Sequence, residues 1–172
     1  MAEPVMVRPH HLAGLCLVTE SNLPSDWPAL LQVMLNRVAS PRYPDSIEEV
    51  ILDRKQFSRF NALTAAKKTF PSYEYVYRKV VTEDVGSSRI DPLLLAHAQD
   101  YAFSVHVHRP PIPEKLFPRL CCPAISPATL HYYSPVSMVP KGSAPAWATT
   151  AKRIYAPEGI DPDRFKFCEG VR

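Results

Sequence analysis

The distribution of proline divides this chain into two parts with different folding options. Eleven of the 19 prolines fall between residues 105 and 165. Proline fixes φ and has no backbone N–H, so a stretch this rich in proline cannot form regular helix. Aromatic residues still recur along it, which makes it too apolar for a disordered tail. We therefore expect ordered loops and short strands here, packed over a helical part built by the first two-thirds of the chain.

The first predicted helix runs from Pro9 to about Ser21. Proline is favoured in the first turn of a helix, and the residue before Pro24 is pushed out of helical geometry. Glu20 therefore lies in the last turn. The side chains predicted to form one face of this helix are Leu12, Leu15, Cys16 and Thr19.

Caps, prolines and apolar residues at three- and four-residue steps predict five more helices. Ser46 with Glu49 three positions later is a capping box, and Asp91 before Pro92 is a cap followed by a first-turn proline. The fold class is therefore mainly α (α+β), in a single domain of residues 1–172. The five helices are expected at about residues 25–40, 46–54, 61–70, 73–81 and 93–103.

Composition restricts the partners and the location that can be expected for the protein, but it does not identify a function. The formal net charge of +3 favours an anionic partner but is too small to identify one. No apolar run approaches the roughly 20 residues that span a bilayer, so no membrane insertion is expected. Residues 1–7 lack a basic start followed by an apolar stretch, so we expect synthesis in the cytoplasm without a signal peptide.

The four cysteines form no CxxC pair, which disfavours a zinc ribbon or a disulfide scaffold. We expect mostly free thiols. A bridge from Cys168 to Cys121 or Cys122 is the alternative.

Several short motifs follow one another in a fixed order. VTES at residues 18–21 contains Glu20, and VMLNRV follows at residues 33–38. YPDSIEEVI at residues 43–51 leads to QFS at residues 56–58. HYYSP at residues 131–135 and PAWA at residues 145–148 complete the series.

In this order and at these spacings, the motifs resemble the spore-cortex-lytic and cell-wall hydrolase family of the SleB type, over about residues 15–168. The resemblance implies a lysozyme-like domain with a goose-lysozyme-like fold. It also implies cleavage of peptidoglycan between N-acetylmuramic acid and N-acetylglucosamine, with Glu20 at the catalytic position. The chain departs from the family at residues 163–167, where DRFKF replaces the usual Gly-x-His-x-Phe ending.

The chemistry of Glu20 agrees with this resemblance. Cleaving a glycoside needs a proton donor at the leaving oxygen. The C-terminal end of a helix is electronegative and apolar walls disfavour a carboxylate, so both raise the pKa of a glutamate placed there. Glu20 is accordingly the predicted general acid of a lytic transglycosylase or muramidase-type glycosidase.

Other site residues are predicted from the remaining motifs. Gln56 and Ser58 are expected to bind the N-acetyl group or glycan hydroxyls, and either Tyr132 or Tyr133 to face the acid or the developing cation. A second carboxylate would be needed for direct hydrolysis. The candidates for it are Asp26, Asp45, Glu48 and Glu49.

A metal site and a cysteine peptidase are two alternatives with less support in the sequence. Alternating histidines can share a metal, as in His106-x-His108 or the His10-His11 pair, but no carboxylate or cysteine completes a ligand set, so we expect neither metal nor cofactor. A cysteine peptidase would need Cys16 as nucleophile, and that thiol is predicted to be buried in an apolar helix.

The rival from another class is a catalytically inactive, structural or wall-binding component of a phage tail or injection apparatus. A virion would bring such a domain to the wall, and a phage endolysin would reach it after synthesis in the cytoplasm. Nucleic acid is not expected as a partner, because Arg54-Lys55 and Lys67-Lys68 are short, scattered pairs without interleaved aromatics. The expected partner is the peptidoglycan glycan strand, with virion proteins as possible further partners.

Overall fold

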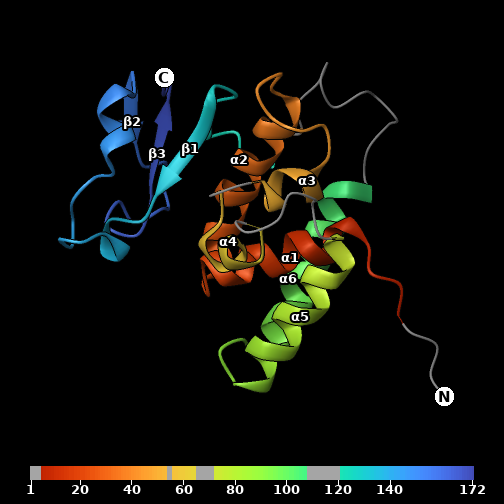
Figure 1. Ribbon diagram of the computed structural model, residues 1–172. Helices are drawn as coiled ribbons and strands as arrows, with labels where there is room; N and C mark the ends of the chain where they lie inside the picture. The colour runs from red at the N-terminus through yellow and green to blue at the C-terminus, as the bar shows by residue number, and fades with distance from the viewer. Residues whose placement is uncertain (1–4, 54–55, 65–71, 108–120) are drawn as a thin grey trace.

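The computed structural model describes residues 5–53, 56–64, 72–107 and 121–172 and has a helical part and a small sheet (Figure 1). Three strands follow the helices in the chain, as the proline distribution predicts, and the mainly α fold class is confirmed. The helices are α1 (Pro9–Glu20), α2 (Trp27–Ala39), α3 (Ile47–Leu52), α4 (Ser58–Thr64), α5 (Tyr73–Gly86) and α6 (Pro92–Val107). The strands are β1 (Thr129–Tyr133), β2 (Arg153–Tyr155) and β3 (Lys166–Glu169).

Helix α1 lies at the centre of the helical part, in contact with α2, α3, α5 and α6. Every residue from Leu12 to Val18 is buried. Burial therefore extends around the helix, beyond the predicted face that contains Leu12, Leu15 and Cys16. A helix that is apolar around its whole circumference needs neighbours on all sides, and here four helices supply them.

Close approach of α1 and α6 depends on a glycine. A Cβ atom at Gly14 would lie 2.6 Å from the Cα and the backbone nitrogen of Gln99 in α6. The two helices overlap in Figure 1, and they are in contact. The absence of a side chain at residue 14 therefore sets their separation.

The predicted caps are present at the helix starts. Ser46 Oγ accepts a hydrogen bond from the backbone nitrogen of Glu49 at 3.3 Å, and Asp91 Oδ1 accepts one from Leu93 at 2.9 Å. Helices α5 and α6 run several residues further than predicted. Helix α4 begins at Ser58 rather than at residue 61, and residues 65–70 of the predicted helix lie outside the described residues.

The sheet has the strand order β1-β3-β2, with both outer strands antiparallel to β3. Tyr132 pairs with Phe167, and the register shifts between Thr129 and His131. Neighbouring strand residues point to opposite faces. Tyr132 accordingly packs against the large helical core, whereas Tyr133 belongs to a second, smaller cluster.

Side chains of α2 hold β1 against the helical part. Asn36 Nδ2 donates to the carbonyl oxygens of Ser126 and Thr129, at 2.9 and 3.0 Å. Arg37 Nε donates to the carbonyl oxygen of Leu130 at 2.7 Å. Buried backbone carbonyls need such partners, so the Asn-Arg pair of the second motif fixes where the strand lies.

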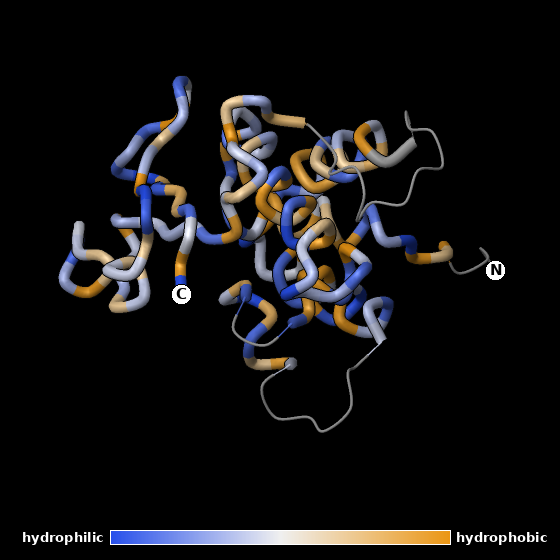
Figure 2. The backbone as a smooth tube through the Cα atoms, turned by 90° about the horizontal axis from the view of Figure 1, so that it is seen from above, coloured by the Kyte–Doolittle hydropathy of each residue, from blue (hydrophilic) through white to orange (hydrophobic). Residues whose placement is uncertain are grey.

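Hydrophobic residues are concentrated along the helices (Figure 2). The large core also takes in Ile125, Phe165 and Phe167, so the proline-rich third packs over the helices as expected. All four cysteines are free, and the alternative bridge from Cys168 is absent. Among the described residues, no helix is long and apolar enough to cross a membrane.

The separation of α1 and α6 can be tested with Gly14→Ala. Helix propensity alone favours alanine by about 1 kcal/mol. The steric conflict with the Gln99 backbone reverses this, and we expect a net loss of roughly 1–3 kcal/mol in the free energy of unfolding. Urea unfolding followed by circular dichroism measures it. Gly86→Ala is the matched control, because nothing lies within 4 Å of its new Cβ; equal stabilities of the two variants would contradict the packing argument.

Candidate active site

A cleft of about 440 Å³ lies between the end of α1, the start of α4 and the segment that follows β1. All five residues predicted from the motifs line it: Glu20, Gln56, Ser58, Tyr132 and Tyr133. The other lining residues are Thr19, Arg37, Asn61, Ser134, Ser137, Met138, Pro145, Trp147 and Phe165.

Glu20 is the last residue of α1, one position before the turn that ends the helix. Ser21 is extended, with φ of −150°. Its Oγ donates to Asp26 Oδ2 at 2.6 Å and accepts from the backbone nitrogen of Leu23 at 3.1 Å. This turn fixes the direction in which the end of α1 presents Glu20.

The same turn is tied to the C-terminal segment. Arg164 Nη2 donates to Ser21 Oγ at 3.0 Å and to the buried carboxylate of Asp26 at 3.1 Å. The next residue, Phe165, lines the cleft. Phe165 stands where the Gly-x-His-x-Phe ending has histidine, so this position carries an apolar ring in place of a titratable group.

Tyr132 is the hydrogen-bond partner of Glu20. Its hydroxyl donates to Glu20 Oε2 at 2.8 Å, across 112 positions of sequence. Three phenylalanine rings surround the tyrosine ring, with centroids 5.9 to 6.5 Å away: Phe57, Phe165 and Phe167. The bond therefore lies in an apolar enclosure.

This enclosure changes the acidity of Glu20. Burial raises the pKa of the carboxyl, and this effect exceeds the opposing effects of the Tyr132 hydrogen bond and the positive charge of Arg37. Burial also raises the pKa of Tyr132 well above its usual value, followed by the neighbouring charge of Glu20. The tyrosine thus keeps its proton, while the glutamate is protonated more readily than one in water.

Arg37 is a buried cation beside this pair, with 4% of its surface exposed. Its Cζ lies 5.3 Å from the ring centroid of Tyr43 and 5.5 Å from that of Phe57. Nη1 is buried and has no hydrogen-bond partner among the described residues. Arg37 therefore anchors β1 through Nε and also acts on Glu20 through its charge. In the sequence, Arg37 lies within the VMLNRV motif.

The α4 side of the cleft carries three polar side chains. Gln56 precedes α4, Ser58 is its first residue, and Asn61 follows about one turn later. Asn61 Oδ1 is buried without a hydrogen-bond partner in the part of the chain that the structure describes. No sequence motif singled out Asn61; its spacing of three from Ser58 on a helix was the available signal.

Aromatic rings form the opposite wall. Tyr133 and Trp147 meet edge to face, with ring centroids 6.0 Å apart. Trp147 is 36% exposed. The exposed indole offers a flat apolar surface with a polar edge, which suits a sugar ring, and the buried Tyr133 ring packs against it.

Glu20 is the one carboxylate among the described residues that line the cleft. Of the four candidates for a second one, Asp26 is bound to Ser21 and Arg164, and Glu49 to Ser46 Oγ at 2.8 Å. Asp45 and Glu48 do not line the cleft. The described lining therefore offers a single acid.

The alternative nucleophile and metal groups do not meet in this cleft. Cys16 is fully buried, and burial raises the pKa of its thiol well above the usual value, which makes it unreactive. Within the described residues, no three histidine, cysteine or acidic side chains group as metal ligands. His108 and the side chain of His106 lie outside the described residues, as do Arg54-Lys55 and Lys67-Lys68.

One comparison with known proteins finds a match over part of the chain. A family model described as Cell Wall Hydrolase matches residues 26–93. The match confirms the resemblance that the motifs indicate, and the family indicates peptidoglycan as substrate. Gln56 and Ser58 fall within it, whereas Glu20 and the two tyrosines lie outside. No curated protein and no solved structure matches the chain, so the likeness to goose-type lysozyme stays a prediction.

Tyr132→Phe tests whether the Tyr132 hydroxyl lowers the pKa of the Glu20 carboxyl. Removing the hydroxyl removes a bond that favours the charged form, so the pKa of Glu20 should rise further. Because the protonated form dominates below the pKa, Glu20 would then stay protonated to higher pH. NMR titration of the labelled Glu20 carboxyl measures this. Tyr133→Phe is the control and should leave the pKa of Glu20 unchanged. An unchanged pKa of Glu20 in Tyr132→Phe would contradict the effect of the Tyr132 hydroxyl.

Proposed function

We propose that this chain cleaves peptidoglycan glycan strands between N-acetylmuramic acid and N-acetylglucosamine as a lytic transglycosylase. The match of residues 26–93 to a family model described as Cell Wall Hydrolase supports this substrate. One observation carries the proposal: a single carboxylic acid, with its pKa raised by burial, lines the cleft among the described residues. That acid is Glu20, which acts first as an acid and then as a base.

In the first step Glu20 donates its proton to the glycosidic oxygen. The bond between that oxygen and C1 of muramic acid breaks, and the N-acetylglucosamine portion leaves as an alcohol. Positive charge develops at C1 and its ring oxygen, while Glu20 becomes a carboxylate. The Tyr132 hydroxyl and the charge of Arg37 stabilise that carboxylate.

In the second step the Glu20 carboxylate removes the proton from the C6 hydroxyl of the same muramic acid. The C6 oxygen then bonds to C1 and closes a 1,6-anhydro ring. Glu20 is protonated again, so the cycle balances without water. A direct hydrolysis would need a second carboxylate to activate water or trap the cation, and the described lining of the cleft holds none.

In this proposal, different lining residues bind different parts of the glycan strand. Trp147 offers an exposed ring on which a sugar can stack, and Tyr133 supports that ring from the side. Gln56 and Ser58 offer polar groups to the N-acetyl group or the hydroxyls on the opposite side. Fixing the sugar between these walls brings its glycosidic oxygen to Glu20. The place of action is the cell wall, which the protein reaches in this proposal as an endolysin or as a virion component.

Glu20→Gln is the direct test. The amide has nearly the same shape but no acidic proton, so release of muropeptides from purified sacculi should fall by roughly 100- to 10,000-fold. Mass spectrometry of the soluble products measures the loss, and circular dichroism checks that the variant folds. Glu49→Gln, outside the cleft, is the matched control. Products that persist in Glu20→Gln would remove Glu20 from the mechanism, and no products from the unaltered chain would support the structural rival.

The chemical form of the product ends separates the two routes. We expect 1,6-anhydromuramic acid ends, which are 18 mass units (one water) lighter than reducing ends, because the C6 hydroxyl attacks. Digestion in ¹⁸O-labelled water gives an independent reading. Label at C1 of the new ends would mean that water attacks and would overturn transglycosylation while leaving Glu20 as the acid.

A further inference from the structure

A second cavity, of about 350 Å³, adjoins the catalytic cleft. Thr19 and Ser58 line both spaces. Thr19 directly precedes Glu20, and Ser58 directly precedes Arg59. The second cavity therefore shares part of its wall with the cleft. Its other lining residues are Val18, Arg59, Asp84, Arg89 and Ile90.

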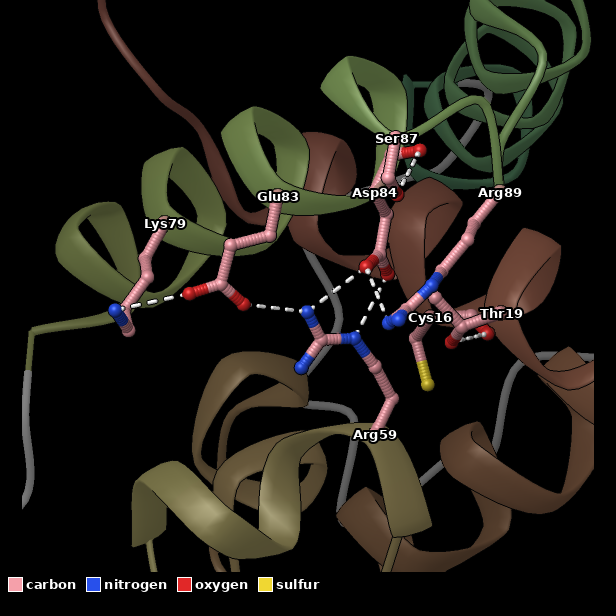
Figure 3. Close-up of polar contacts among 8 residues, drawn as sticks. All are labelled: Cys16, Thr19, Arg59, Lys79, Glu83, Asp84, Ser87 and Arg89. Atoms are coloured by element: carbon pink, nitrogen blue, oxygen red, sulfur yellow. Dashed lines mark hydrogen bonds and ion pairs between the residues drawn. The ribbon is translucent and has the colours of Figure 1, made fainter.

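Three lining residues, Arg59, Asp84 and Arg89, belong to an ion-pair network (Figure 3). Arg59 Nε donates to Asp84 Oδ2 at 2.7 Å, and Nη2 donates to Asp84 Oδ1 at 2.9 Å. Nη2 also reaches Glu83 Oε2 at 2.7 Å, and Lys79 Nζ lies 2.9 Å from the other oxygen of Glu83. Asp84 is buried, so its charge is satisfied by the two-pronged contact with Arg59.

Arg89 differs from the other members of the network. Its Nη1 lies 3.8 Å from Asp84 Oδ1, beyond hydrogen-bond distance, and its side chain is 72% exposed. The turn that carries it is well fixed: the backbone nitrogens of Arg89 and Ile90 donate to the carbonyl oxygen of Asp84 at 2.8 and 3.1 Å. A rigid turn thus presents a guanidinium whose carboxylate neighbour is already bound by Arg59.

The charges in this group do not balance. Three cations (Arg59, Lys79 and Arg89) face two carboxylates (Glu83 and Asp84), which leaves one positive charge in excess, at the exposed rim. A planar guanidinium at the rim of a cavity is suited to a carboxylate ligand. The cavity therefore fits an acidic group attached to whatever occupies the catalytic cleft.

We propose that this second cavity binds a free carboxylate of the peptide stem of peptidoglycan, and that Arg89 is the residue that recognises it. The inference rests on the proposed function. The stem is attached through the lactyl group at C3 of the muramic acid whose C1 bond is cut. It must therefore leave the catalytic cleft into an adjoining space, and this cavity shares two wall residues with the cleft.

The test distinguishes recognition of the negative charge of the stem from recognition of the stem itself. Sacculi free of teichoic acid are used as they are, or after carbodiimide coupling to ammonia, which converts stem carboxylates to neutral amides and leaves every stem in place. The unaltered chain and Arg89→Gln are compared on both substrates by kcat/KM for release of soluble fragments at low salt. Arg153→Gln is the matched control, since Arg153 is also an exposed arginine in an ion pair, with Glu169 on the sheet.

We expect Arg89→Gln to lower kcat/KM by roughly two- to fivefold on native strands, mostly through KM, because an exposed charge pair contributes little individually. The two proteins should be equal on amidated strands. Raising the salt should reduce the difference on native strands. Arg153→Gln should behave as the unaltered protein on both.

Three results would overturn the inference. One is an Arg89→Gln effect of the same size on amidated strands, which would indicate a role independent of stem charge. Another is no effect on native strands. The third is an effect seen only with sacculi that retain teichoic acid, which would identify a phosphate as the ligand.

Binding to sacculi tests the stem site even if the protein does not cleave them. Glu20→Gln protein and the Glu20→Gln, Arg89→Gln double variant are sedimented with native and with amidated sacculi. Weaker binding of the double variant on native sacculi alone supports the stem site, even if the unaltered chain releases no fragments and the proposed function fails. Equal binding of both proteins to native sacculi would overturn the stem site, whether or not fragments are released.

Discussion

The attachment of β1 to α2 is the contact on which the rest of the site depends. Asn36 and Arg37 donate three hydrogen bonds to backbone carbonyl oxygens at residues 126, 129 and 130. These donors are buried, so the strand cannot shift without leaving polar groups unpaired at a cost of about 1–3 kcal/mol each. The strand in turn places Tyr132 against Glu20. One motif on a helix thereby sets the position of the tyrosine that contacts the acid.

The acid itself reflects a balance between burial and nearby polar groups. Burial raises the pKa of Glu20, and Phe165, which packs on the ring of Tyr132, is an apolar ring where the family ending has histidine. The Tyr132 hydroxyl and the Arg37 charge act in the opposite direction. An acid that must give up a proton and later take one back needs both forms to be accessible. Without the Tyr132 hydroxyl and the Arg37 charge, burial alone would favour the protonated form of Glu20 more strongly.

Two charged clusters hold the elements that carry the cleft residues. Arg164 binds Asp26 and Ser21, joining the turn after Glu20 to the C-terminal segment. Arg59 binds Asp84, joining the start of α4 to α5. In each cluster a buried carboxylate is met by an arginine with two contacts, so neither charge is left unsolvated. The second cluster also carries the exposed charge of Arg89 beside the cleft.

Local signals in the sequence determined the starts of α1, α3, α5 and α6, the proline-driven change to strands, the place of Glu20 in a last turn and the cell-wall hydrolase motifs. They depend on residues within a few positions of one another, through caps, fixed φ angles and helical spacing. The structure decided that α1 is buried all round, that Tyr132 rather than Tyr133 reaches the acid, and that Arg37 and Asn61 line the cleft. These facts depend on contacts between segments as far apart as the 112 positions that separate Glu20 from Tyr132, and such contacts follow from how the helices and the sheet pack together rather than from any local pattern.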